Sequence, residues 1–511
     1  MIGGEKKPTR EGNERRSIRM KRIIAWILTL VLAAGCALAA NAEDADFSAP
    51  PQMDGSAPAG TPPEKPDGEM PGGTPPDGMP GNGGPGGTPP DGMPGNGGGF
   101  GGSTPPGGGT SSFEYTAATE ITEAAALTDQ TCASETADES ALIINTADVV
   151  TVDNPTVTKT GDSNGGDNCN FYGLNAAVLV MGGSTTTING GTITSDASGA
   201  NGVFCYGGNG ASNGAGGDGT TVIINDTTIT TTGNGSGGIM TTGGGITYAN
   251  NLTVTTSGGS SAPIRTDRGG GTVVVDGGTY TSNGLGSPAI YSTADITVQN
   301  ATLVSNLSEG VCIEGMNSIT LENCDMTANN TAMNGNATFL DTIMIYQSMS
   351  GDADSGESHF TMTGGSLTSL SGHMFHVTNT NAVITLTGVT LVNEGSDVLL
   401  SVCDDGWSGA GNAAELIADG QELSGLLLVG DNSSLTLTMR NGSSFVGAVS
   451  GEITNAKGDV VSTEVGTVSV TLDSTSTWTL TADTYITSFE GDIANVIGNG
   501  YTLYVDGTAY N

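Results

Sequence analysis

The chain has 511 residues, of which 83 are glycine, 5% are aromatic and 13% are charged. Its net charge is −39, and past residue 42 only 6 basic residues stand against 50 acidic ones. A surface this acidic repels phosphate backbones, so we exclude nucleic acid as a partner. It also disfavours anionic membrane surfaces. Divalent cations and neutral or cationic partners remain compatible with the charge.

Residues 1–42 have the pattern of an export signal with an N-terminal extension. Met20 is followed by two basic residues and then by an apolar run from Ile23 to Ala34, which is too short to span a bilayer. The Ala-Asn-Ala sequence that ends at Ala42 is a small-x-small cleavage site. We therefore predict that translation starts at Met20 and that the signal is removed after Ala42.

A competing interpretation places a lipid anchor within the same segment. The sequence from Leu32 to Cys36 resembles a lipoprotein lipobox, although Ala33 stands where that motif usually has a larger aliphatic residue. Both interpretations predict an extracellular protein, either secreted or attached to the cell surface. Membrane attachment would then occur only through a lipidated Cys36.

Residues 43–112 are predicted to be a disordered linker. This stretch is rich in Pro, Gly and Met, and the string GGTPPDGMPGNGG occurs at 72–84 and again at 86–98. Proline donates no backbone hydrogen bond, glycine has high backbone entropy, and almost no apolar residue is available to bury. We interpret the segment as a spacer.

From about Val149 the chain repeats a unit of three short strands separated by polar turns. The strands alternate apolar and polar residues and are rich in β-branched ones, and no segment keeps a 3.6-residue period. One apolar position per unit marks the middle strand: Val157, Ile193, Ile229, Val254, Tyr280, Leu303, Met326, Leu367 and Leu391. The base period is 23–26 residues, and longer units contain insertions, such as 207–219 and 352–358, that we expect to be loops.

Three strands per coil, with Asn, Asp and Gly at the corners, predict an all-β parallel β-helix over residues 113–511. The repeat pattern resembles the right-handed parallel β-helix superfamily, the pectin and pectate-lyase-like proteins. That group includes polysaccharide lyases, glycan-binding modules and adhesin-like bacterial surface proteins. The resemblance covers Val149–Gly409 well and implies a fold far more specifically than an activity.

The third strand of each unit carries an apolar position that we expect to face the core. These positions are Val178, Phe204, Ile239, Ile264, Ile290, Cys312, Ile343, Phe375 and Leu399. The next residue must then point outward, which predicts an outward row of Leu179, Cys205, Met240, Arg265, Tyr291, Ile313, Met344, His376 and Leu400. This row is too apolar for an exposed surface. Either another part of the chain covers it or it binds a ligand.

If the row is a ligand surface, Met240, Arg265, Tyr291, Met344 and His376 are its candidate binding residues. A Tyr ring beside a guanidinium and thioethers could stack a sugar face and hydrogen-bond its polar groups. Such a row would serve a glycan or another cell-surface component.

Pectate-lyase-like enzymes, which the fold resembles, use Ca²⁺ held by carboxylates and a basic residue that abstracts a proton. Arg265 and Arg268 flank Thr266-Asp267 at a strand end and could hold a uronate carboxylate. The alternative is local pairing with Asp267 and other acids. We assign no catalytic residue.

Other candidate sites carry weaker signals. Asp404-Asp405 beside Trp407 could form an acidic site, weakly suggestive of Ca²⁺, with a sugar-stacking ring, or could be a solvated turn. The three His residues are too few and too scattered to predict zinc. Six Cys remain after residue 42, and we expect most of them to be free and buried.

The middle strands of four successive units carry a Thr-x-Thr pattern. These are Thr192 and Thr194, Thr228 and Thr230, Thr253 and Thr255, and Thr279 and Thr281. We expect the two Thr of each strand to point outward and form a flat ladder. Such ladders resemble the arrays of ice-binding solenoids, but Thr is also simply a good exposed strand residue.

The leading functional hypothesis is an adhesin-like surface or secreted β-helix protein that binds glycan without catalysis. The first alternative is a polysaccharide lyase or glycoside hydrolase. The second is a structural or ice-binding solenoid.

Overall fold

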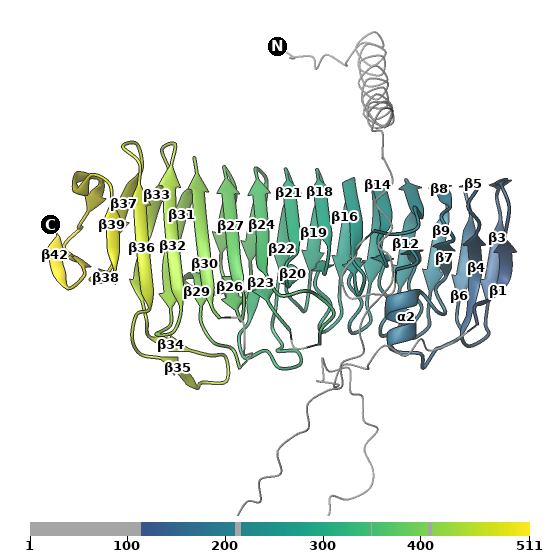
Figure 1. Cartoon of the computed structure of the whole chain (residues 1–511), viewed down its shortest axis with the longest axis horizontal. Coiled ribbons are helices and arrows are strands. Elements are labelled where there is room, and N and C mark those ends of the chain that lie inside the picture. The colour runs from purple at the N-terminus through teal and green to yellow at the C-terminus, as the bar shows by residue number, and fades with distance from the viewer. Residues whose placement is uncertain (1–113, 210–215, 349, 407–410, 511) are drawn as a thin grey trace, which may run out of the picture. The chain divides into compact units, whose positions relative to one another are not determined.

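The computed structural model describes residues 114–209, 216–348, 350–406 and 411–510, all within the compact unit Gly92–Asn511. The predicted export signal, the linker, Cys36 and Trp407 lie outside the described residues. The described part is an all-β parallel β-helix, as the repeat pattern predicts (Figure 1).

One wall of the β-helix is a 15-stranded parallel sheet, here called sheet A. Its strands are β1 (Thr116–Ile121), β4 (Glu139–Asn145), β7 (Val178–Met181), β10 (Val203–Tyr206), β13 (Ile239–Thr242), β15 (Ile264–Thr266), β17 (Ile290–Ser292), β20 (Val311–Glu314), β23 (Asp341–Tyr346), β26 (His373–Thr378), β29 (Val398–Val402), β31 (Glu422–Val429), β33 (Ser444–Ser450), β37 (Thr477–Leu480) and β40 (Val496–Ile497).

The other two walls form a 22-stranded sheet, here called sheet B, in which the long strands β14 and β16 run through both walls. Its strands are β2 (Ala125–Thr128), β3 (Thr131–Ser134), β5 (Val149–Asp153), β6 (Thr156–Lys159), β8 (Thr185–Asn189), β9 (Thr192–Ser195), β11 (Thr221–Asn225), β12 (Thr228–Thr231), β14 (Gly245–Thr256), β16 (Gly271–Ser282), β18 (Asp295–Gln299), β19 (Thr302–Ser305), β21 (Ser318–Glu322), β22 (Asp325–Ala328), β24 (Glu357–Thr363), β25 (Ser366–Ser369), β27 (Asn381–Thr387), β28 (Thr390–Asn393), β30 (Ala413–Asp419), β32 (Ser434–Arg440), β36 (Thr467–Leu472) and β39 (Ser488–Glu490).

Smaller elements lie outside these walls. They are the helix α2 (Asp167–Tyr172), the antiparallel pair β34 (Ile453–Thr454) and β35 (Val460–Ser462), the 3₁₀ helix η1 (Ile493–Asn495), and the small sheet of β38 (Thr484–Ile486), β41 (Leu503–Val505) and β42 (Thr508–Tyr510).

The middle-strand column predicted from the sequence is confirmed at every position. Each of its residues pairs with the next from Val157 to Leu391. The coils also continue past Ala413 to β40. The described residues of the two insertions, 207–209, 216–219 and 352–358, lie in connections between sheets A and B, apart from the first residues of strand β24, and the register is intact on either side.

The corner between the two walls of sheet B is made by residues with a left-handed backbone. Asn154, Asp226, Asn251 and Asn300 all have φ between 50° and 55° there. Asn and Asp tolerate this conformation because their short side chains hydrogen-bond locally. Neighbouring corners are also joined, since Asn251 Nδ2 donates to Asp226 Oδ1 over 2.7 Å. The predicted role of Asn, Asp and Gly at corners therefore has a direct backbone cause.

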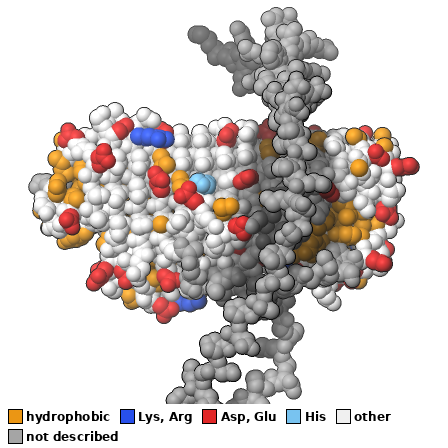
Figure 2. Space-filling view, viewed as in Figure 1, with side chains coloured by type: hydrophobic (Ala, Val, Ile, Leu, Met, Phe, Trp, Pro, Cys, Tyr) orange, Lys and Arg blue, Asp and Glu red, His pale blue; other side chains and the backbone are white. Residues whose placement is uncertain are grey.

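The outer face of the second wall is exposed and polar. Thr192, Thr228, Thr253 and Thr279 pair across four coils and point into solvent. The surface seen in Figure 2 is mostly uncharged and polar, with acidic side chains scattered over it and few basic ones. The interior is one continuous core of mostly aliphatic side chains with a few aromatic ones, and the six described Cys are free and buried.

Candidate functional site

The outward row of sheet A exists, but its membership differs from the predicted one. Paired residues give Leu179, Phe204, Met240, Arg265, Tyr291, Cys312, Met344 and His376. Cys205, Ile313 and Leu400, which were predicted to point outward, belong to the core. The error arises where three successive residues are apolar, as in Val203 to Cys205, because either register then buries an apolar side chain.

Most of this row is covered by other parts of the chain. Met240, Arg265 and His376 keep only 1%, 8% and 0% of their surface. Residues 329–340, here called the arch segment, place the Phe339 ring against His376 at 4.5 Å between centroids. The row is therefore not an open ligand surface, and these three residues do not face a ligand.

The two arginines are engaged with acidic side chains. Arg265 Nη2 lies 2.7 Å from Asp267 Oδ2, and Arg268 Nη2 lies 2.6 Å from Asp352 Oδ1. Burial raises the pKa of Asp267 to about 7, although Arg265 opposes that shift. Arg268 also stacks over the Phe171 ring of α2 at 4.3 Å. Both arginines are thus paired with acids, which is the alternative that the sequence left open. Through these contacts they hold the covering segments against the β-helix.

A buried carboxylate fixes two tyrosines of sheet A. The Tyr291 hydroxyl donates to Glu314 Oε2 over 2.6 Å, and the Tyr346 hydroxyl donates to the same oxygen over 3.2 Å. Ser350 Oγ donates to Glu314 Oε1 over 3.1 Å, and Ser348 contacts that oxygen too. Burial raises the pKa of Glu314, and the hydrogen bonds from Ser348, Tyr291 and Ser350 oppose this shift. Both rings are thus held in one orientation before any ligand arrives.

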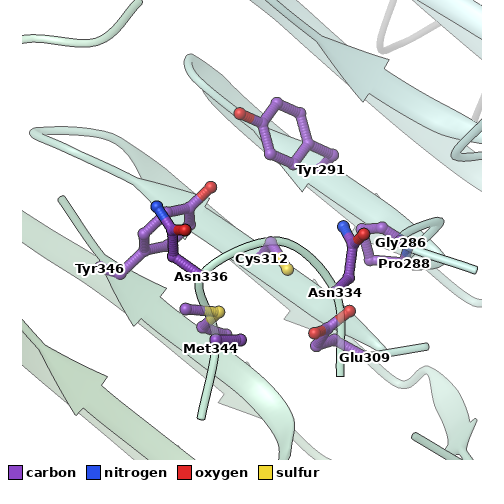
Figure 3. A pocket seen from close by; sticks show the side chains of 10 residues that line it. Gly286, Pro288, Tyr291, Glu309, Cys312, Asn334, Asn336, Met344 and Tyr346 are labelled. Atoms are coloured by element: carbon purple, nitrogen blue, oxygen red, sulfur yellow. The ribbon is translucent and has the colours of Figure 1, made fainter. Parts of the chain in front are cut away.

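The cover is incomplete beside these two rings, where a pocket remains. Its volume is about 410 Å³, a figure that includes space open to solvent. The lining residues are Gly286, Pro288, Tyr291, Glu309, Cys312, Asn334, Asn336, Ala337, Met344 and Tyr346, here called the Tyr pocket. Figure 3 shows Cys312 and Met344 between the tyrosines and Glu309, with the arch segment crossing the pocket between Asn336 and Asn334.

The deep walls of the Tyr pocket are mostly buried. Tyr291, Cys312, Met344, Tyr346 and Glu309 keep 4–6% of their surface, and the inward Ile290 and Ile343 keep 0%. The pocket therefore opens to solvent mainly at its rim. Asn336 is exposed at the rim, and Asn334 is half-buried there.

A pair of buried acids lies at one side of the pocket. Burial raises the pKa of Glu309, and burial together with Glu309 and Asp405 raises the pKa of Asp341 well above its usual range. Asp341 Oδ1 has no hydrogen-bond partner among the described residues. Two buried carboxyl groups that repel each other in this way cannot both ionise readily.

The other predicted acidic site does not form. Asp404 is exposed, and its carboxylate accepts a hydrogen bond from the backbone N–H of Gly406 two residues later. Asp405 is buried, and its carboxylate accepts a hydrogen bond from the backbone N–H of Thr338 over 2.7 Å. The two carboxylates do not converge on one site. Across the described ranges, no group of three or more His, Cys, Asp or Glu side chains could hold a metal ion.

Asp405 instead anchors a buried polar cluster beneath the arch segment. Its Oδ2 lies 3.7 Å from His376 Nε2, and His376 Nδ1 lies 2.8 Å from Ser401 Oγ. A Ser-His-Asp arrangement that lies in an accessible cleft is a signature of hydrolases. Here His376 and Ser401 are fully buried, and Phe339 stacks on the imidazole. No substrate reaches these atoms, so the cluster holds the cover in place.

Of the predicted binding residues, the structure brings Tyr291 and Met344 together at the pocket. Sequence analysis missed Tyr346, Glu309, Asn334 and Asn336. Tyr346 had a usable signal, since it lies two residues after Met344 on the same strand and therefore on the same face. Asn334 and Asn336 had none, because they lie on the arch segment, whose path does not follow the repeat. Glu309 had none because it lies in the turn before β20, where strand alternation assigns no facing direction.

The comparisons with known proteins add no relative. No family model, no curated protein and no solved structure matches the chain. Within the described residues, no helix has the length and apolar character needed to cross a membrane.

Proposed function

We propose that the protein is an exported, adhesin-like β-helix protein that binds a glycan in the Tyr pocket without catalysis. One observation carries the proposal: two tyrosine rings, clamped by a shared carboxylate, stand beside a solvent opening rimmed by two asparagines. The predicted extracellular location, secreted or on the cell surface, belongs to the same proposal.

The lining chemistry suits a sugar. Aromatic rings contact the apolar faces of saccharide rings, and side-chain amides both donate to and accept from hydroxyl groups. Small-ligand sites combine mostly apolar walls with a few placed polar groups. Because Glu314 already fixes Tyr291 and Tyr346, little side-chain freedom is lost when a ligand binds.

A glycan array probed with the chain lacking its export signal tests this proposal. We expect retained ligands to lose at least about tenfold in affinity in Asn336→Ala, since the rim loses a hydrogen-bonding side chain that is exposed and supports no core packing. Asn432→Ala is the matched control, because Asn432 is an exposed loop asparagine outside the pocket lining. Equal binding by both variants and the parent would place any glycan site elsewhere.

The enzymatic alternative rests on a different observation, the buried pair of Glu309 and Asp341. A carboxyl group with a raised pKa that lines a pocket is the kind of group that protonates a glycosidic oxygen. This favours a glycoside hydrolase over a lyase, since Arg265 and Arg268 are engaged with acids. Release of reducing ends from retained glycans by the parent, abolished in Glu309→Gln, would establish it and contradict binding without catalysis.

A further inference from the structure

The Tyr pocket has an apolar floor and a polar rim. Pro288, Cys312, Ala337 and Met344 contribute carbon and sulfur atoms, and the two tyrosine rings stand beside them. The Cys312 thiol stays protonated because burial raises its pKa well above the usual range, so it acts as an apolar group. This part of the lining therefore favours an apolar group over a hydroxyl group.

The rim adds two side-chain amides, of which that of Asn334 is held in place. The Asn334 amide packs against Gly286, since a Cβ added at Gly286 would come within 2.2 Å of Asn334 Nδ2. The Ala337 amide donates to the Asn334 carbonyl over 3.2 Å, which closes the turn that carries Asn336. Side-chain amides so placed can pair with an amide group of a ligand, donating to its carbonyl and accepting from its N–H.

The described residues of the lining include no Lys, Arg or His, and their ionisable groups are the Glu309 carboxyl, the Cys312 thiol and the two phenols. Arg265, whose guanidinium carbon lies 5.8 Å from the Tyr291 ring centroid, and Arg268 are already paired with Asp267 and Asp352. A ligand carboxylate would thus meet acidic groups without a compensating cation. The uronate that the arginine pair suggested from sequence does not suit this pocket.

We propose that the Tyr pocket receives the acetamido group of an N-acetylated amino sugar. The methyl group occupies the floor formed by Cys312 and Met344, and the amide meets the asparagines at the rim. This inference rests on the proposed glycan binding and specifies its ligand class.

The ligand series that tests it varies the substituent at C2 of each sugar ring. Isothermal titration of the chain without its export signal compares chitotetraose, its fully deacetylated form, an N-butanoylated form and cellotetraose. We expect chitotetraose to bind at least about tenfold more tightly than the other three. The deacetylated form and cellotetraose lack both the methyl group and the amide, and the longer chain of the N-butanoylated form must displace the buried side chains of the floor. Titrations at high ionic strength remove the general attraction of the deacetylated polyamine to this acidic chain.

A filled-pocket variant checks the location. Ala337→Met projects a longer side chain into the floor and should abolish the preference for chitotetraose. Ala332→Met is the matched control, because Ala332 lies in the same arch segment but outside the lining. The ligand series remains decisive if Ala337→Met does not fold.

The outcomes separate this inference from the proposed function. Equal affinity for chitotetraose and cellotetraose would overturn the acetamido assignment while leaving glycan binding intact. Equal affinity for chitotetraose and an acetyl-lysine peptide would overturn the assignment of a sugar ligand and would leave only the recognition of an acetamido group. No binding of any oligosaccharide, here or on an array, would overturn both proposals.

Discussion

Two outer faces of the same β-helix differ in what covers them. The Thr face of sheet B presents Thr192, Thr228, Thr253 and Thr279 to solvent. The matching row of sheet A presents Met240, Tyr291 and Met344, and it lies under α2, the arch segment and neighbouring loops, except at the Tyr pocket. An apolar outward row in a solenoid therefore indicates a cover, and the place where the cover stops is the place to look for a site.

The largest expected effect tests which side of a strand faces the core. Ile290→Asp places an unpaired charge among aliphatic side chains at a fully buried position, and we expect it to lower the free energy of unfolding by about 4 kcal/mol or more. Thr279→Asp, on the exposed Thr face, should cost less than about 0.5 kcal/mol. Urea denaturation followed by circular dichroism measures both. Similar losses would mean that the Thr face is also covered.

The cover itself should contribute strongly to stability. Phe339→Ala removes a buried ring that stacks on His376 at 4.5 Å, and we expect a loss of about 3 kcal/mol. Met333→Ala changes an exposed residue of the same arch segment and should cost less than about 0.5 kcal/mol. If Phe339→Ala were equally mild, the arch segment would not be part of the packed structure.

The covered face should also make stability depend on pH. Burial raises the pKa of Asp267 from 3.8 to about 7, so between those values the folded state binds more protons than the unfolded state. The contribution of Asp267 to the free energy of unfolding is fully present below pH 3.8 and is lost as the pH rises through about 7. We expect the melting temperature to fall across this window and the slope to flatten in Asp267→Asn. A slope unchanged by Asp267→Asn would contradict this assignment.

The smallest effect concerns the tie between Arg268 and its partners. Arg268→Ala removes a partly exposed ion pair with Asp352 and the contact with the Phe171 ring, so we expect a loss of about 1 kcal/mol. Arg440→Ala breaks the more exposed pair with Asp419 and should cost less, because solvent screens it. Chemical denaturation of the two variants makes the comparison, and the reverse order would argue that α2 is not tied down through Arg268.

The sequence analysis was accurate where apolar and polar residues alternate along a strand and wrong where they do not. The middle-strand column is correct throughout because each apolar residue there, such as Ile193 between Thr192 and Thr194, has polar neighbours that permit only one register. The outward row failed at Cys205 and Ile313, where three apolar residues in succession leave the register open. Tyr291 and Met344, two of the predicted binding residues, line the Tyr pocket, and the pattern could single them out because they belong to the periodic strands.

The repeat alone determined the parallel coils, the corners and the exposed Thr ladder, because neighbouring coils make the same contacts at a nearly constant spacing. Only the tertiary structure decided which outward row is covered, that Arg265 faces Asn170 across 95 residues of sequence, and where the arch segment leaves a pocket open. Those contacts join insertions that have no period. Their positions depend on packing between distant segments, which a local pattern does not encode.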